Sequence, residues 1–418
     1  MDQEKLCNKK LKLVFISVLI AMLSCSTNVK SKTAVNDSGQ AVNTEITNPL
    51  NMDFAFKLFK TVEKSQPKLN TCISPFSVSM ALGMCSNGAR GETAEEIKQL
   101  LYNRGFNKQV FNRSVSNYLD SLAHLDHNVK LEIGNSIWIR QEFPVADQFI
   151  EENREYYNAR VENLDFNKNE AVEIINNWVA KSTNNKIEEI VQPPLDAQTI
   201  MFLINAIYFN GNWTNQFDPK RTKQDVFYTT DRAEVDCQMM RIKEDFTYFE
   251  NDGMQIIDLP YGQKKFSMTI VLPRKIERLD SILSTLSREN WQQWVEKMSK
   301  QEVRLFLPKF KMNYKIKLNQ VLIDLGLPAA FDPDRSNFAG INKEYAEKIY
   351  IDQVLHKTFL EVDEKGTEAA AVTSARMTVT STYPPKEPLI MRVDHPFLFA
   401  IRERQTGNVL FIGKIEKP

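Results

Sequence analysis

Few residues of this chain have the types and spacing that catalysis requires. The one match to a nucleophile motif is Ser65-Gln66-Pro67-Lys68, which fits a Ser-x-x-Lys pattern. Its proline and its position in a polar stretch after a helix argue against a buried nucleophile and base, and the partner motifs of that enzyme class are missing. No Gly-x-Ser-x-Gly, His-Glu-x-x-His or phosphate-binding Gly-rich motif is present either. We interpret the stretch as a turn and predict that the protein is not an enzyme.

The histidines and cysteines do not form a metal-ligand pattern. The four histidines are scattered through the chain at His124, His127, His356 and His395. There is no Cys-x-x-Cys, so no metal or other cofactor is expected. Cys72 and Cys85 lie in apolar patterns, and we predict buried free thiols there. The apolar neighbours of His356 predict a hydrogen-bonded histidine in the core and not a general base.

The segment from Glu364 to Ser381 has an unusual composition for a loop. Taken as a strand, its alternate residues form one uncharged face made of Thr367, Ala369, Ala371, Thr373, Ala375, Met377 and Val379. The opposite face carries both charges, on Glu368 and Arg376. This is the pattern of a strand with small residues on its inner face. From the pattern alone, a short surface helix built on the alanines fits equally well.

The elements that must position these residues are helices early in the chain and strands later. Helical spacing of apolar residues covers 50–64, 74–87, 93–101, 108–125, 145–157 and 170–190. A capping box at Thr93 is expected to open the third of these helices. Strand-like segments cover 200–209, 246–249, 255–259, 266–272, 303–310, 356–362, 397–402 and 409–415. The predicted class is α+β.

The first 25 residues have the pattern of a targeting segment. A lysine-rich start precedes the apolar run from Leu13 to Leu23, which is too short to span a bilayer comfortably. Cys25 directly follows a small residue, which resembles a bacterial lipoprotein processing site; an ordinary secretory signal with an incidental cysteine is the alternative. We therefore expect an exported protein that is lipid-anchored in the bacterial cell envelope through Cys25 or secreted. Residues 26–48 are polar and predict a flexible tether, and 49–418 form one domain.

Composition excludes several classes of protein. The 418 residues contain 53 Lys and Arg against 53 Asp and Glu, so the formal net charge is zero and nucleic acid is a poor candidate partner. Hydrophobic residues make up 42% and charged residues 25% of the chain, as in an ordinary globular protein that can bury a large core. Polyanionic cofactors receive no support from this charge balance.

Several stretches resemble the serpin family in that family's order along the chain. They are the hinge sequence 364–371, the shutter sequence 70–79 with 88–93, the central-strand sequence 203–209 with Gly211, Trp213, Phe217, Thr222 and Phe227, and the C-terminal sequences 394–399 and 411–414. The likeness spans residues 49–418. It implies a serpin fold of three β-sheets with about eight or nine helices. It also implies an exposed reactive loop at about 364–390, which a protease cuts and which then inserts into the largest sheet.

The resemblance also implies roles for individual residues. The hinge of the loop comprises Glu364, Gly366, Thr367, Glu368, Ala369, Ala370 and Ala371. Gly366 permits the turn at which insertion begins, and Thr367, outside the sheet in the uncut chain, then enters it. At the top of the sheet, the breach, Glu364 and Lys309 are expected to form a salt bridge near Trp213. Beneath it, a hydrogen-bonded group called the shutter is expected to contain Ser74, Ser77, Asn205 and His356.

The resemblance implies that the protein is a suicide-substrate inhibitor, expected to trap a serine or cysteine endopeptidase as a covalent 1:1 acyl-enzyme. The family's loop length places the cut bond at Thr380-Ser381, with bonds after Met377, Val379 or Tyr383 as alternatives. A small residue before that bond favours an elastase-like or subtilisin-like serine protease. The protein is expected to be a monomer that reaches a membrane only through its lipid anchor. A non-inhibitory binding or carrier protein on the same fold is the alternative function.

Overall fold

The computed structural model describes residues 34–35, 41–42, 48–103, 105–346, 349–367 and 387–418, in two units, Met1–Thr47 and Asn48–Pro418. In the first unit, β1 (Ala34–Val35) pairs antiparallel with β2 (Ala41–Val42) within the segment predicted as a tether. The predicted signal peptide and Cys25 lie outside the described residues. Among the helices that the structure describes, none combines the length and the apolar character needed to cross a membrane.

The described part of the second unit contains nine α-helices, and six of them precede residue 183. They are α2 (Met52–Ser65), α3 (Pro75–Gly88), α4 (Gly91–Leu101), α5 (Lys108–Ala123), α6 (Asp147–Tyr157), α7 (Asn169–Ser182), α8 (Leu279–Thr285), α9 (Arg288–Lys297) and α10 (Asn319–Asp324). The six early helices confirm the predicted ones. The three later helices were not predicted, because each has at most ten residues and presents few turns of apolar spacing.

Two predicted helix ends are wrong. Helix α4 begins before the predicted capping box, and the Oγ1 atom of Thr93 accepts a hydrogen bond from the backbone N–H of Asn337 at 3.0 Å. Thr93 therefore joins two distant segments and does not cap a helix. Helix α7 ends at Ser182 and not at residue 190, because Asn184 and Asn185 adopt left-handed backbone angles, with φ of 49° and 58°.

A six-stranded sheet lies between two helices of this unit. Its strand order is β12-β13-β14-β6-β4-β5. The strands are β4 (Val129–Arg140), β5 (Arg160–Leu164), β6 (Met201–Asn212), β12 (Phe310–Lys317), β13 (Leu355–Val362) and β14 (Gly366–Thr367). Helix α3 packs on β6 from one side, where Ile207 and Phe209 join the main core. Helix α7 packs on β4 and β6 from the other side, where Phe202 and Ile204 join a smaller apolar cluster. Successive side chains of β6 thus face opposite layers.

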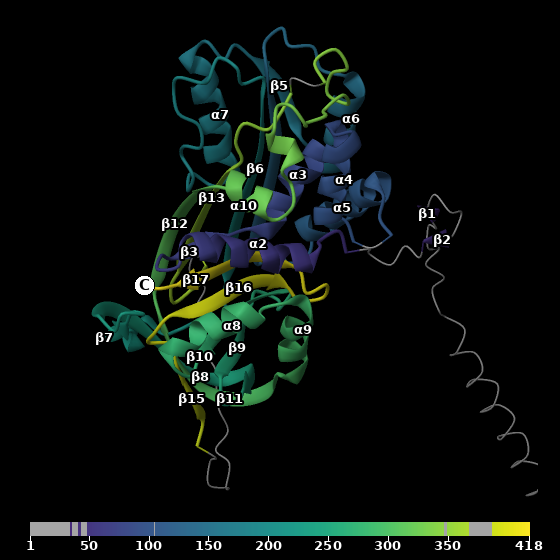
Figure 1. The fold of residues 1–418 in the computed structure, drawn as a ribbon. Coiled ribbons are helices and arrows are strands. Elements are labelled where there is room, and N and C mark those ends of the chain that lie inside the picture. Colours follow the sequence, from purple (N-terminus) through teal and green to yellow (C-terminus); the bar gives the residue numbers. More distant parts are fainter. Residues whose placement is uncertain (1–33, 36–40, 43–47, 104, 347–348, 368–386) are drawn as a thin grey trace, which may run out of the picture. The chain divides into compact units, whose positions relative to one another are not determined.

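The other strands form a nine-stranded sheet, which Figure 1 shows in the lower half of this unit together with α8 and α9. The strands are β3 (Thr71–Ile73), β7 (Lys223–Tyr228), β8 (Glu234–Glu250), β9 (Met254–Tyr261), β10 (Phe266–Pro273), β11 (Ser299–Pro308), β15 (Leu389–Arg392), β16 (Phe397–Glu403) and β17 (Val409–Ile415). The 17-residue β8 pairs with β7 and β11 along most of its length and with β9 at its end. It therefore joins β7 and β11 to β9 within one continuous sheet. With the six-stranded sheet and the β1–β2 pair of the first unit, the described residues form three sheets.

Several strands were missed from the sequence. These are β3, β4, β5, β7, most of β8, β12 and β15. The predicted strand 303–310 is in fact the end of β11 and the start of β12, which belong to different sheets. The prediction that strands follow helices is also wrong in part, because β4 and β5 lie between helices. Strand β4 lacks simple alternation, since Ile137, Trp138 and Ile139 are all buried.

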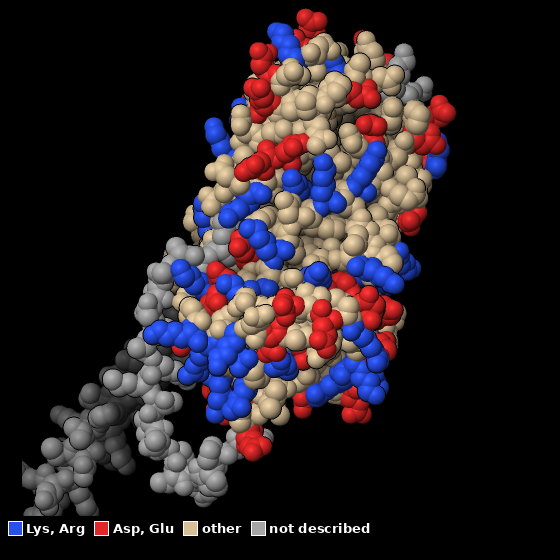
Figure 2. Space-filling model, turned by 90° about the vertical axis from the view of Figure 1, so that its left-hand side faces the viewer, with Lys and Arg blue, Asp and Glu red and all other residues tan. Residues whose placement is uncertain are grey.

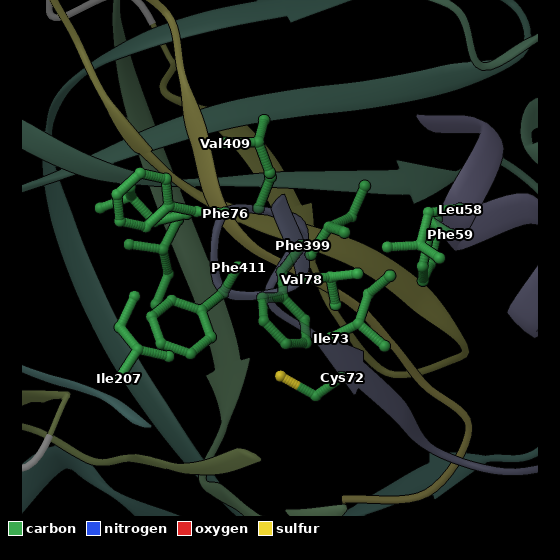
Figure 3. Packing of buried hydrophobic residues seen from close by; sticks show 14 of the residues in the cluster. Leu58, Phe59, Cys72, Ile73, Phe76, Val78, Ile207, Phe399, Val409 and Phe411 are labelled. Atoms are coloured by element: carbon green, nitrogen blue, oxygen red, sulfur yellow. The ribbon is translucent and has the colours of Figure 1, made fainter. Parts of the chain in front are cut away.

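The main core joins the helices to both sheets. Figure 3 shows Phe76 and Val78 of α3 beside Ile207 of β6 and Phe399 of β16. Strand β3 contributes Cys72 to the same cluster. The contacts connect segments that are hundreds of residues apart, so the position of β6 depends on packing across the whole unit.

Candidate functional site

The hinge residues Gly366 and Thr367 form a two-residue strand inside the six-stranded sheet. Thr367 is paired with Val362 of β13 on one side and with Gly211 of β6 on the other. Gly366 is paired with Asn212. Among the described residues, these two are the only ones that lie between β13 and β6. The sequence analysis expected Thr367 outside the sheet until cleavage, and this expectation is wrong: pairing to two neighbours already holds it there in the uncut chain.

The backbone of Gly366 passes very close to β6. A Cβ atom added at this position would lie 2.0 Å from the carbonyl oxygen of Gly211 and 2.8 Å from the Cα atom of Asn212. Real Cβ atoms do not approach backbone atoms so closely, so any larger side chain would force the strands apart. Glycine at this position is therefore required by the close approach of two strands.

Thr367 is buried, with 1% of its surface exposed, and its side chain faces the core. Its Oγ1 atom lies 2.6 Å from the hydroxyl oxygen of Tyr261 in β9. Burial raises the pKa of Tyr261, although the hydrogen bond to Thr367 opposes this effect. The ring of Tyr261 stacks on that of Trp213, with the ring centres 4.4 Å apart. A charged residue in place of Thr367 would have to be desolvated without a partner.

Glu364 and Lys309 form the ion pair expected at the breach. The Nζ atom of Lys309 lies 2.9 Å from Glu364 Oε2, and Thr222 donates a hydrogen bond to Glu364 Oε1 at 2.8 Å. Burial acts to raise the pKa of Glu364, but the hydrogen bonds from Lys309 and Thr222 hold the pKa below its ordinary value. The carboxylate is therefore charged and held in a fixed position, with 8% of the residue exposed.

Trp213 binds the same turn through its backbone and its side chain. Its backbone N–H donates to the carbonyl oxygen of Lys365 at 2.8 Å, and its indole Nε1 donates to the carbonyl oxygen of Asp363 at 3.0 Å. The backbone N–H of Phe217 donates to the carbonyl oxygen of Glu364 at 2.9 Å. The residues after β6 thus fix the chain where it leaves β13 and turns into β14. Sequence reasoning missed the parts played by Asp363 and Tyr261.

Three of the four shutter residues lie together. The Oγ atom of Ser74, which caps α3, accepts a hydrogen bond from the backbone N–H of Ser77 at 3.1 Å. The backbone N–H of Ser74 donates to Nε2 of His356 in β13 at 3.0 Å. Burial lowers the pKa of His356 to about 4, so the ring is neutral and able to accept that bond at neutral pH. Next to it, Thr358 Oγ1 donates to the carbonyl oxygen of Cys72 at 2.7 Å.

The fourth predicted shutter residue, Asn205, has a different partner. Its Nδ2 atom donates to Asn135 Oδ1 of β4 at 2.7 Å, and Asn135 Nδ2 donates to the carbonyl oxygen of Tyr157 at 2.7 Å. The Oδ1 atom of Asn205 is buried and has no hydrogen-bond partner in the described part of the chain. The expectation that Asn205 joins the group of Ser74 and His356 is therefore wrong. Asn135 could not have been assigned, because β4 itself was not predicted.

Within the described residues, β6 and β13 are not paired with each other over the parts that precede Gly211 and Val362, the two partners of Thr367. The starts of both strands, at 201–204 and 354–355, line a cavity of about 150 Å³. Residues Ala81, Leu82 and Cys85 of α3 form another part of its lining. The lining is mostly apolar, so the cavity can accept apolar groups without leaving polar atoms unpaired.

The other predicted site residues either lie outside the described part of the chain or belong to no reactive group. Glu368, Ala369, Ala370, Ala371, Thr380 and Ser381 lie outside the described residues. Cys72, Cys85 and Cys237 are buried free thiols, and burial raises the pKa of Cys72 and of Cys85 to about 12. No group of three or more metal-binding side chains occurs in the part of the chain that the structure describes. Serine 65 ends helix α2, where its Oγ donates to the carbonyl oxygen of Val62.

Comparison with known proteins identifies this arrangement. A family model described as serpin, serine protease inhibitor, matches residues 49–418. The chain belongs to the serpin family. A serpin-like protein from Methanosarcina acetivorans is 36% identical over 375 residues, which cover 88% of this chain and 87% of that protein. Human neuroserpin is 33% identical over 377 residues, covering 88% of this chain and 90% of neuroserpin.

Solved serpin structures share the fold. The thermophilic serpin tengpin in its native state superposes with a TM-score of 0.81 at 30% identity, covering 93% of this chain and 98% of tengpin. Human thyroxine-binding globulin, solved in complex with thyroxine, has a TM-score of 0.79 at 29% identity, covering 89% of this chain and 98% of the globulin. Serpins are mainly protease inhibitors or binding proteins, so the family supports inhibition of proteases in general terms.

Proposed function

We propose that this serpin is a suicide-substrate inhibitor of a serine or cysteine endopeptidase, with an elastase-like or subtilisin-like serine protease favoured. The protease's nucleophile attacks the carbonyl of the bond at Thr380-Ser381, the new amine departs, and an ester or thioester joins the two proteins. The cut loop then inserts between β13 and β6 before water releases the enzyme. The complex is covalent and 1:1.

The orientation of Thr367 is the observation that carries this proposal. Its side chain faces the core, so in a continued strand every second residue after it faces the core as well. Those residues are Ala369, Ala371, Thr373, Ala375 and Met377. All are uncharged, whereas Glu368 and Arg376 fall on the other face. Insertion would therefore bury no charge.

The register of the hinge supplies a second argument. Thr367 is paired with Val362 and Gly211, and its strand runs antiparallel to both neighbours. Thr373 lies six residues after Thr367, and His356 and Asn205 lie six residues before Val362 and Gly211. A continued strand would place Thr373 between His356 and Asn205, where a hydroxyl group could donate to the unpartnered Asn205 Oδ1. Still further on, residues 374–377 would pass the cavity between the starts of β6 and β13.

Energy and reach are sufficient for such a trap. Gly366 and Thr367 are already in the sheet, so insertion up to the cut bond would add thirteen residues, 368–380, which at about 3.3 Å each span roughly 43 Å. If most of them gain one or two backbone hydrogen bonds at about 0.5–1.5 kcal/mol net, insertion releases on the order of 10–20 kcal/mol. This is comparable to the stability of a whole domain, so the uncut state would be kinetically held.

A carrier function is the alternative, since a neighbour with the same fold is human thyroxine-binding globulin in complex with thyroxine. Incubation with a panel of serine and cysteine proteases separates the two proposals. An inhibitor gives SDS-stable complexes of the summed mass, and mass spectrometry of the released C-terminal peptide locates the cut. A carrier is either left intact or cleaved without a covalent product.

We further propose that the protein is exported and, through Cys25, attached to the bacterial envelope. Mass spectrometry of the mature N-terminus for a lipidated cysteine tests this.

A further inference from the structure

A row of side chains crosses three strands of the nine-stranded sheet beside the end of the reactive loop. Strand β15 runs parallel to β11 and places Ile390 opposite Arg304, and β11 runs antiparallel to β8 and places Arg304 opposite Lys243. All three are exposed, and Ile390 keeps 57% of its surface in solvent although it is a large apolar residue. The row therefore presents one apolar side chain next to two cations.

The next row on the same face is also basic. Arg392, Phe306 and Arg241 stand opposite one another, two residues further along each strand. The guanidinium carbons of Arg392 and Arg241 lie 5.3 Å and 5.5 Å from the centre of the Phe306 ring. Asp225 binds both cations, at 2.6 Å and 3.2 Å, and Asp394 binds Arg392 at 2.9 Å. These contacts hold the two arginine side chains in place before a partner binds, so less conformational entropy would be lost on binding.

The side chain of Arg304 differs from those of its neighbours because its guanidinium group has no ion pair or hydrogen bond with any residue that the structure describes. Lys243, directly across from it, pairs with Glu302 at 3.1 Å. Like charges directly opposite each other on antiparallel strands destabilise a sheet, so Arg304 is not explained by the stability of the fold. We call the set Arg241, Lys243, Arg304, Phe306, Ile390 and Arg392 the basic surface. Figure 2 shows Lys and Arg gathered at the lower end of the molecule, where Figure 1 places β7, β8, β11 and β15.

We propose that the basic surface is a second docking site for the protease that attacks the reactive loop, and that it selects a protease with acidic residues beside its active-site cleft. The inference rests on the proposed inhibitory function. Ile390 is nine residues after Ser381 (390 − 381), so a fully extended chain separates them by at most about 30 Å. A protease bound at the cut bond is wide enough to reach over this distance.

Such a site acts on the rate of encounter and leaves the chemistry of the loop unchanged. Complementary charge near the reacting groups raises the association rate constant, and salt screens the effect. Replacing Arg304 should therefore slow complex formation at low salt without changing the cut bond or the number of inhibitor molecules used per enzyme. Because Arg304→Glu also removes the repulsion from Lys243, the variant should be at least as stable as the parent protein.

The test compares Arg304→Glu with Arg113→Glu in the full chain. Arg113 lies exposed on α5, and its guanidinium group is likewise without a partner among the described residues, so both variants change the net charge equally. For each protease that forms an SDS-stable complex with the parent, association rate constants are measured at 50 mM and 500 mM NaCl, and thermal melting checks that each variant is folded. We expect Arg304→Glu to lower the constant about fivefold to tenfold at low salt and less than about twofold at high salt, with Arg113→Glu close to the parent.

The outcomes separate this proposal from the inhibitory function itself. If the two variants agree within twofold for every protease that is trapped, the basic surface is not a docking site and the inhibitory function stands. If Arg304→Glu changes the inhibitor-to-enzyme ratio and leaves the rate constant alone, the surface affects insertion, and the docking proposal is also overturned. If no protease is trapped by the parent, both proposals fail together.

Discussion

The hydroxyl groups of Thr367 and Tyr261 lie 2.6 Å apart, both in the interior of the protein. This contact joins the first residues of the reactive loop to β9 in the other large sheet. The loop is thus anchored in the six-stranded sheet at one end before any protease acts. The partly inserted hinge fixes both the register and the inner face that a longer insertion would adopt.

The first prediction concerns a charge at the hinge. Thr367→Arg places a guanidinium group where the structure has a buried hydroxyl, which costs several kcal/mol, roughly 3–5 if the charge stays unpaired. An arginine there would displace the hinge from the sheet and slow the insertion of the residues after it, so water would release the protease first and the protein would become a substrate. We expect cleaved inhibitor with little covalent complex on SDS gels. Glu368→Arg is the matched control, because alternation from Thr367 would put residue 368 on the outer face of an inserted strand. Undiminished complex formation by Thr367→Arg would contradict the insertion mechanism.

A second prediction follows from the close approach of Gly366 to Gly211. Gly366→Ala introduces a Cβ atom 2.0 Å from a carbonyl oxygen, so β14 must leave its place between β13 and β6. We expect a loss of roughly 1–3 kcal/mol and faster hydrogen exchange at the N–H groups of the paired strands. Gly253→Ala is the control, because its nearest neighbours are flexible side-chain atoms at 3.3 Å and 3.4 Å. Equal exchange rates in the two variants would show that the hinge is not held by this pairing.

The third prediction concerns the ion pair at the breach. Lys309→Ala removes the cation that pairs with the buried carboxylate of Glu364 and leaves the Thr222 hydrogen bond in place, and we expect a loss of about 1–3 kcal/mol in the stability of the uncut protein. Lys311→Ala removes a cation that pairs with Glu361 on the exposed face, and it should change stability by less than about 1 kcal/mol. Urea unfolding at pH 7 measures both. A Lys309→Ala effect no larger than that of Lys311→Ala would remove the claim that this pair secures the turn.

The fourth prediction is a pH dependence that comes from His356. Its pKa is about 4 in the folded protein, against 6.5 for an ordinary histidine, so the unfolded chain binds a proton that the folded protein excludes. The contribution of His356 to stability is therefore complete above pH 6.5 and is lost as the pH falls from 6.5 towards 4, by about 3 kcal/mol. Protonation also removes the acceptor for the Ser74 N–H.

The variant His356→Gln isolates this contribution. Glutamine cannot titrate, so the stability difference between the parent and His356→Gln should shrink as the pH is lowered from 7 to 4.5. His124→Gln, at an exposed position, should keep the pH dependence of the parent. Melting temperatures measured in steps of half a pH unit provide the comparison. If the difference between parent and His356→Gln stays constant over this range, the buried histidine does not control acid stability.

How far the site could be predicted depends on whether its signal is local. The hinge sequence, the ion pair of Glu364 with Lys309, and the core position of His356 were available from sequence, because motif resemblance and apolar patterning carry them. The position of Thr367 inside the sheet could not be predicted from sequence. A two-residue strand is defined by its neighbours β6 and β13 and is too short to show a periodicity of its own. The partner of Asn205 was missed with β4, whose buried residues do not alternate.

The last prediction concerns the energy stored in the uncut protein. If residues after Thr367 insert when the loop is cut, the cleaved protein gains on the order of 10–20 kcal/mol. For a domain of 370 residues, 49–418, the unfolding entropy is about 0.8 kcal/mol per degree, so the melting temperature should rise by roughly 10–25 °C. To measure the shift, the protein is cut near Thr380 by a protease that leaves the rest of the chain intact. Calorimetry then gives the melting temperatures of the cut and the uncut protein. Thr367→Arg, cleaved at the same bond, should show a much smaller rise because a buried charge at residue 367 would prevent the residues after it from following into the sheet. Equal melting temperatures for cut and uncut parent protein would mean that the uncut fold stores no such energy, and the trapping mechanism would then lack its driving force.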